Sequence, residues 1–250
     1  MEQPGTTPPL TGAVRELATQ VVSTLTSGGH SPVSAYPPVT TGDDELGLAA
    51  VRVLGADVLL PAVLHRTLPA PADLAVCEKA VLAYPPGPDA SPTSLWSHRA
   101  MVRTLAALGA PAAGATLAGP EPDAAWLEDL PWQALTHQLA LLAALAVPPT
   151  GTTPGAAAGP GALAPSAVAD VARRRTVDIA RGFVRAVRRR GWLQAAAAGR
   201  WLAHLDGVPR TLGLDAGLEF VGLMGGDDPR VALHLHAARP VRDGVPAGPR

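Results

Sequence analysis

Proline and glycine are the residues that most limit what this chain can fold into. The 250 residues include 27 prolines and 26 glycines, and proline breaks helices and removes a hydrogen-bond donor from strands. The chain is therefore divided into short segments, many of which place apolar residues at helical spacing. No part of residues 1–150 alternates apolar and polar residues as a run of strands would. We predict a mainly α-helical fold, either a multi-helix bundle or stacked helical hairpins.

Apolar spacing gives approximate positions for the helices. They are expected at about 11–27, 43–54, 57–67, 71–83, 92–109 and 132–147. In the first of these, Val14, Leu17, Val21 and Leu25 fall on one stripe, which predicts the buried face. Hydrophobic residues make up 47% of the chain but aromatic residues only 4%. The core is therefore expected to consist of Leu, Val and Ala, with helices in close approach.

A repeated tetrapeptide bears on the choice between a bundle and stacked hairpins. Ala-Tyr-Pro-Pro occurs at 35–38 and 83–86, and each copy precedes a Val-Arg-x-Leu sequence, at 51–54 and 102–105. A duplicated helical unit would produce this pattern and would favour stacked hairpins. Chance repetition in a chain so rich in alanine and proline is the interpretation we favour.

Charge is distributed unevenly along the chain. Residues 1–165 contain 6 basic and 13 acidic residues, whereas residues 166–250 contain 14 basic and 8 acidic residues. Between the two parts, residues 148–165 carry no charge and no apolar periodicity, as linkers often do. We predict an acidic helical domain at 1–147 and a basic helical subdomain at 166–250. The Gly/Ala/Pro-rich stretch 148–165 is either a linker or an internal loop.

The basic part opens with a segment that contains eight arginines, Ser166 to Arg190. We predict one continuous amphipathic helix here. Its apolar side carries Ala172, Thr176, Ile179, Phe183 and Val187, and its opposite side carries Arg174, Arg181, Arg185 and Arg188. Ion pairs with Asp170 and Asp178 are expected at three- and four-residue spacing. The four arginines are the predicted partner-binding residues, and a solvated helix face is the alternative interpretation.

Composition narrows the possible chemistry and location. Lys79 is the only lysine, and together with the abundant alanine, glycine and proline this indicates a GC-rich bacterial genome. Cys77 is the only cysteine, which excludes an intramolecular disulfide and suggests a buried apolar side chain in a reducing compartment. No signal peptide is recognised, and the longest strongly apolar run, 139–147, is shorter than the roughly 20 residues of a membrane span. A cytoplasmic protein without a membrane span is expected.

Histidines are the candidates for catalysis. His98 and His137 lie on apolar helices, where they would act as acid and base only if both faced one cavity. His234 and His236 alternate with apolar residues, as in a short C-terminal β element, and could then bind a metal with Asp227 or Asp228. If Asp228 and Pro229 instead begin a helix, the two imidazoles point apart. We expect no metal and no cofactor.

These features predict a non-catalytic adaptor or accessory protein. Its arginine face would bind an acidic protein surface or a second copy of the chain. Nucleic acid is not the expected partner, because the aromatic residues that stack on bases are scarce. The alternatives are an enzyme that acts on a small apolar molecule in a bundle pocket with a histidine acid/base, and a DNA-binding accessory protein. The sequence does not decide whether the protein is an enzyme.

Overall fold

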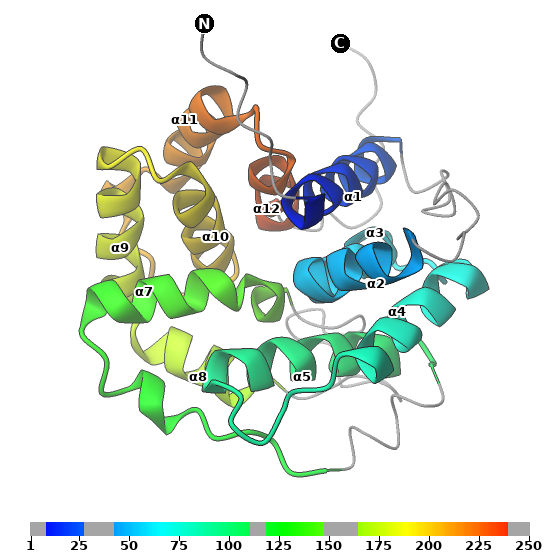
Figure 1. Ribbon diagram of the computed structural model, residues 1–250. Coiled ribbons are helices and arrows are strands. Elements are labelled where there is room, and N and C mark those ends of the chain that lie inside the picture. Colours follow the sequence, from blue (N-terminus) through cyan, green and yellow to red (C-terminus); the bar gives the residue numbers. More distant parts are fainter. Residues whose placement is uncertain (1–8, 28–42, 111–118, 148–164, 240–250) are drawn as a thin grey trace, which may run out of the picture.

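The protein is mainly α-helical, as predicted (Figure 1). The computed structural model describes residues 9–27, 43–110, 119–147 and 165–239, and these residues contain no strand. In chain order the helices are α1 (Pro9–Thr26), α2 (Asp43–Leu54), the 3₁₀ helix η2 (Gly55–Leu59), α3 (Leu60–His65), α4 (Pro71–Ala83), α5 (Pro92–Ala107), η3 (Ala125–Leu127), α7 (Trp132–Leu141), η4 (Ala143–Ala146), α8 (Ala167–Arg174), α9 (Thr176–Arg188), α10 (Trp192–Ala203), η5 (Arg210–Leu212), α11 (Leu214–Gly225) and α12 (Pro229–Ala238).

The first core lies among α1 to α5. The predicted stripe of α1 is buried, and it packs against apolar residues of α2, η2 and α3. Residues of α4 and of the second half of α5 complete this core from the other side. Tyr36, which belongs to the first copy of the repeated tetrapeptide, lies outside the described residues. The interpretation of the repeat as chance therefore stays a prediction.

The second core surrounds α10. Residues Ala195 to Leu202 of this helix are all buried, and α7, α9, α11 and α12 pack around it. In Figure 1, α10 lies between α9 and α12, above α7. Small side chains on α10 let its neighbours approach closely, as the composition predicted.

The two parts of the chain that flank 148–164 share both cores. Helix α12 packs on α1, and its Leu233 and Ala237 belong to the first core. Conversely, α7 and Trp96 of α5, which precede residue 148, contribute to the second core. The division into 1–147 and 166–250 stays a prediction, and most of 148–165 lies outside the described residues.

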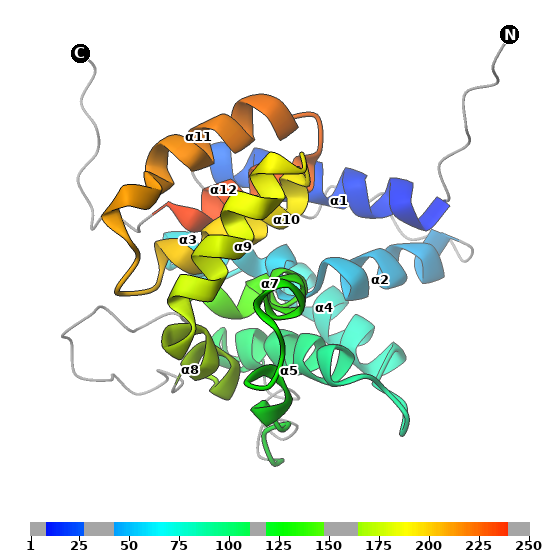
Figure 2. The ribbon, with the colours of Figure 1, turned by 90° about the vertical axis from the view of Figure 1, so that its left-hand side faces the viewer.

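The predicted continuous arginine helix is wrong, because it breaks at Arg175. This residue leaves helical geometry (φ −115°, ψ 27°) and separates α8 from α9. Its guanidinium Nη1 donates to the carbonyl oxygens of Glu128, at 2.9 Å, and Leu130, at 2.7 Å, and its Nε donates to Asp178. The break lets α8 pack on η4 while α9 packs on α7 and α10. Figure 2 shows the change of direction between the two helices.

The short β element expected near the C-terminus is not present in the described residues, because 229–238 form α12. The Asp228 carboxylate accepts a hydrogen bond from the backbone N–H of Arg230, and Pro229 occupies the first turn. Both features favour the start of a helix. The helical alternative for the His234 and His236 segment is therefore the observed one.

Gly182 allows α9 to lie directly against α7. A Cβ atom at this position would lie 2.0 Å from Oγ1 of Thr136. We expect Gly182→Ala to lower the free energy of unfolding by about 1–3 kcal/mol, because the helices would have to separate. Gly12→Ala is the matched control, since nothing lies within 4 Å of a Cβ there and alanine favours the helix by up to about 1 kcal/mol. Equal effects of the two substitutions in urea denaturation would contradict the close approach.

One stretch of the described chain, Glu45–His65, is long and apolar enough to cross a membrane by length and composition alone. It comprises most of α2 together with η2 and α3, and 56% of its most apolar window is buried in the fold. Asp57, within this stretch, is paired with Arg200 of α10. The absence of a membrane span and the cytoplasmic location stay predictions.

Candidate functional site

An open groove runs along the outer face of α9, and we call it the arginine groove. Its volume is about 840 Å³. Four arginines line it, namely Arg181, Arg185, Arg188 and Arg189, together with residues of α7 and of the 209–212 segment. Three of the four predicted partner-binding arginines therefore lie in one groove.

The charges of the groove are only partly neutralised. Arg181 lies 3.3 Å from the carboxylate of Asp178, which also pairs with Arg175 at 2.7 Å. The guanidinium of Arg185 lies over the ring of Trp132, 5.6 Å from its centroid. Arg188 and Arg189 are exposed and form no ion pair with the described residues. The groove therefore has an excess of positive charge.

Apolar side chains lie between these arginines. Val177 is 52% exposed and Val184 is 42% exposed, and both line the groove. Trp132 and Leu212 form parts of its walls. Exposed apolar area flanked by cationic side chains is typical of a surface that binds another molecule.

Arg174, the fourth predicted partner-binding residue, does not line the groove. It lies on α8 and forms an ion pair with Glu128. The expected pair between Asp170 and Arg174 does not form, because Asp170 pairs with Arg173 and Arg174 pairs with Glu128. Asp178 and Arg181 do form the expected pair.

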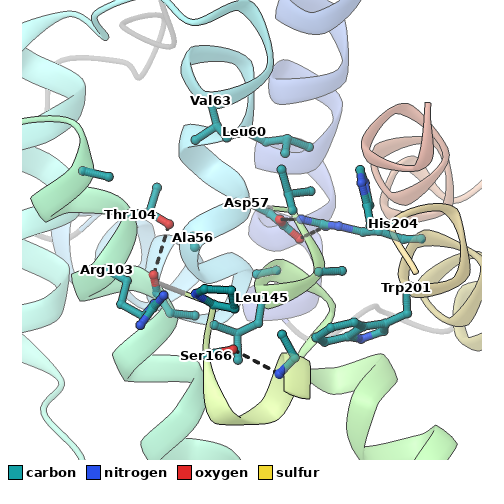
Figure 3. Close-up of a pocket in the computed structure, with 18 of the residues that line it drawn as sticks. Ala56, Asp57, Leu60, Val63, Arg103, Thr104, Leu145, Ser166, Trp201 and His204 are labelled. Atoms are coloured by element: carbon teal, nitrogen blue, oxygen red, sulfur yellow. Dashed lines mark hydrogen bonds and ion pairs between the residues drawn. The ribbon is translucent and has the colours of Figure 1, made fainter. Parts of the chain in front are cut away.

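A second candidate site, which we call the central cavity, is a partly open pocket. Its volume is about 190 Å³. Figure 3 shows Asp57 and Leu60 on one side, Thr104 of α5 on another, and Trp201 of α10 with His204, which directly follows α10, opposite. Elements from both parts of the chain therefore build this site.

A buried ion pair forms part of the cavity wall. The guanidinium of Arg200 donates to Asp57 through Nη1, at 2.9 Å, and through Nη2, at 2.8 Å. The Arg200 side chain is 1% exposed and that of Asp57 is 8% exposed. The Nε–H of Arg200 is buried and has no hydrogen-bond partner among the described residues. The ion pair therefore contains one buried donor that the described protein atoms do not satisfy.

His204 lines the central cavity as a neutral acceptor. Its Nε2 lies 2.7 Å from the carbonyl oxygen of Ala237, and since a carbonyl only accepts, Nε2 carries the proton and Nδ1 carries a lone pair. Burial and, to a smaller extent, the positive charge of Arg200 lower the pKa of His204, although the bond to Ala237 opposes them. His204 is therefore neutral near pH 7.

His234 of α12 extends the ion pair into a network. Its Nδ1 lies 3.3 Å from Nη1 of Arg200. Arginine only donates, so this nitrogen accepts and the ring is neutral. Burial, followed by the charge of Arg200, lowers the pKa of His234 to about 4. His234 and Asp57 also line an outer cavity of about 380 Å³, so that the ion pair lies between the two cavities.

The two histidines predicted as a catalytic pair do not line a common cavity. His98 is half-buried on α5, and burial together with nearby Arg52 lowers its pKa. His137 is exposed on α7 at the edge of the outer cavity. None of the three cavities described here is lined by both.

Comparison of the chain with models of protein families, with curated proteins and with solved structures finds no match. The geometry must therefore carry any functional proposal.

Metal and thiol chemistry find little support in the geometry. No group of three or more His, Cys, Asp or Glu side chains that could hold a metal ion occurs in the described part of the chain. Cys77 is buried, and burial, with a smaller effect of Asp73, raises the pKa of its thiol to about 12. A thiol with so high a pKa is a poor nucleophile.

The sequence prediction missed the buried network of Asp57, Arg200 and His234. The sequence did contain features that point to this network. Asp57 is the only charged residue in the apolar run 53–64, and Arg200 is the only one between 191 and 205. A lone charge on an otherwise apolar helix is costly unless a partner is buried with it. Because Asp57 and Arg200 are two such residues of opposite charge, an ion pair between them could have been predicted.

Proposed function

We propose that this protein is a non-catalytic accessory protein that binds an acidic segment of a partner protein in the arginine groove. The observation that carries the proposal is that Arg181, Arg185 and Arg188 line one open groove together with exposed apolar side chains. Each of these arginines lies on α9, which is held firmly by α7 and α10.

Charge supports an acidic partner. The charged residues that line the groove are all arginines, and among the described residues only Asp178 pairs with one of them. A guanidinium binds a carboxylate through two parallel hydrogen bonds and loses less hydration than an ammonium group. The groove is therefore suited to glutamate and aspartate side chains.

The apolar side chains support a peptide over a bare polyanion. Val177 and Val184 occupy the spaces between the arginines, and phosphate groups gain nothing from contact with them. A helix with acidic residues on one stripe and leucine on the next would use both features. Stacking of Arg185 on Trp132 also holds that guanidinium in place, which reduces the entropy lost on binding.

The test uses a fluorescent peptide in which glutamate and leucine alternate at helical spacing, with a lysine-for-glutamate peptide as the control ligand. We expect the acidic peptide to bind, and the double variant Arg181→Glu/Arg185→Glu to weaken binding about tenfold or more. Raised salt should also weaken binding, since exposed charges are screened. Fluorescence anisotropy measures both effects.

The matched control is Arg66→Glu/Arg239→Glu, which makes the same charge change at exposed arginines outside the groove. It should leave binding within about twofold of the native value. Equal losses in the two double variants would show a general charge effect and would contradict the groove. Tighter binding of a DNA duplex than of the acidic peptide would favour the DNA-binding alternative instead.

A further inference from the structure

We infer that α11 of a second copy of this chain occupies the arginine groove, so that two copies exchange this helix and form a dimer. The inference rests on the proposed function, because it names the acidic helix that fills the groove. It starts from α11 itself, a helix of 12 residues in which only Val221 and Gly225 are buried.

One side of α11 exposes large apolar side chains. Leu223 is 77% exposed, Met224 is 52% exposed and Phe220 is 45% exposed. Residues three and four positions apart lie on the same side of a helix, so these three form one patch. The ring of Phe220 meets that of Trp192 edge to face, with the two centroids 5.9 Å apart, which holds it in place. An exposed apolar patch of this kind is typical of a surface that another protein covers.

Two carboxylates lie along the edge of this patch. Asp215 and Glu219 are four positions apart and exposed, and neither forms an ion pair with the described residues. Glu219 and Leu223 are neighbours on the helix surface, because they are also four positions apart. Helix α11 therefore carries acidic residues on one stripe and apolar residues on the next, which is the combination that the arginine groove is suited to bind.

The groove presents the complementary pattern. Arg181 and Arg185 are four positions apart on α9, about 6 Å along the axis, and the two carboxylates of α11 have the same spacing. The exposed side chains of Val177 and Val184 lie beside these arginines in the groove. Both carboxylates can therefore pair with guanidinium groups while the apolar patch of α11 covers the valines.

Helix α11 does not turn this side toward the groove of its own copy. It packs on α10 and α12, and the fit is close. A Cβ atom at Gly225 would lie 2.6 Å from Cβ of Trp192, and one at Gly217 would lie 2.9 Å from the ring of Phe183 on α9. These contacts use the side of α11 opposite its exposed residues. The exposed side therefore faces outward and meets the groove of another copy.

The two surfaces are neighbours on each copy. Pro209, Thr211 and Leu212 line the groove, and α11 begins at Leu214. Figure 2 shows α9 and α11 on the side of the molecule that faces the viewer. A twofold axis beside them would give two identical contacts and a closed dimer. In this dimer both grooves are filled, so that an acidic partner protein competes with α11 for them.

An exchange of charge between two variants tests this pairing. Arg181→Glu/Arg185→Glu makes the groove acidic, and Asp215→Arg/Glu219→Arg makes α11 basic. We expect the native chain to dimerise in the micromolar range, and each double variant alone to dimerise about tenfold or more weakly, because both contacts then join like charges. An equimolar mixture of the two variants should recover native dimerisation, because each contact again joins opposite charges. Analytical ultracentrifugation over a concentration series measures the four samples.

A pair of leucine substitutions tests the apolar part of the contact. Leu223→Ser should weaken dimerisation about tenfold. Leu68→Ser is the matched control, because Leu68 is 86% exposed and lies outside both α11 and the groove. It should leave dimerisation within about twofold of the native value. Circular dichroism confirms that both variants are folded, and equal losses in the two would overturn the role of α11.

Peptide binding separates this inference from the proposed function. Asp215→Arg/Glu219→Arg leaves the groove intact and frees it of α11, so this variant should bind the acidic peptide more tightly than the native chain does. A native chain that binds the peptide but stays monomeric would overturn the exchange of α11 and leave the proposed function standing. A mixture of the two charge variants that associates no better than each alone would overturn it too. Failure of the variant with the freed groove to bind the peptide would contradict the proposed function instead.

Discussion

Replacing Asp57 with asparagine is expected to lower the free energy of unfolding by about 3–5 kcal/mol. The substitution keeps the shape of the side chain but removes the charge that balances Arg200. Because the Arg200 side chain is 1% exposed, its guanidinium would remain charged, buried and without a counterion. Urea denaturation followed by circular dichroism measures the loss.

Two further variants give this prediction its controls. Asp170→Asn removes the partner of Arg173 in an exposed pair, and such a loss costs about 1 kcal/mol or less. The double variant Asp57→Leu/Arg200→Met replaces the whole buried pair with apolar side chains and should recover most of the stability. A cost for Asp57→Asn no larger than that for Asp170→Asn would mean that Asp57 is not needed to balance the buried charge of Arg200.

Local features of the sequence account for most of the helices that were predicted correctly. The segment 71–83 was expected to be helical, and α4 has the same bounds. The segment at about 92–109 begins where expected because Ser91 caps it and Pro92 occupies its first turn. Such signals act over one turn of chain, so they can be read without knowledge of the rest of the fold.

Contacts between distant segments account for what the sequence did not reveal. Nothing within Ser166 to Arg190 marks a break at Arg175, because the break is stabilised by carbonyl groups of residues 127–130. Asp57 and Arg200 are separated by 143 positions, and they meet because η4 packs against both α10 and η2. The pattern of one helix predicts which face is buried, but it does not identify the residue on the facing helix.

The arginine groove could be predicted from the sequence only in part. Helical spacing placed Arg181, Arg185 and Arg188 on one face, and the structure has all three in the groove. Trp132, which contacts Arg185, comes from α7 and could not be assigned from the arginine segment alone. The prediction therefore identified the cationic face but not its apolar walls.

Acidification is expected to reduce stability between pH 6.5 and pH 4, with His234 as the main cause. Burial and the charges of Arg200 and Arg230, which outweigh those of Asp57 and Asp228, lower the pKa of His234 from 6.5 to about 4. In this pH range the unfolded chain binds a proton that the folded chain does not. The contribution of His234 is therefore complete above pH 6.5 and is lost as the pH falls, by roughly 3 kcal/mol in total. His204, whose pKa is also lowered by burial, acts in the same direction.

His234→Asn isolates this contribution, because asparagine can still accept a hydrogen bond from Arg200 but does not titrate. The free energy of unfolding of this variant, measured in urea at a series of pH values, should fall by roughly 3 kcal/mol less than that of the native protein between pH 6.5 and pH 4. His137→Asn is the control, because it makes the same substitution at an exposed position on α7. If His234→Asn kept the native pH dependence, the Nδ1 of His234 would not be held as an acceptor by Arg200, and the network would reduce to the ion pair alone.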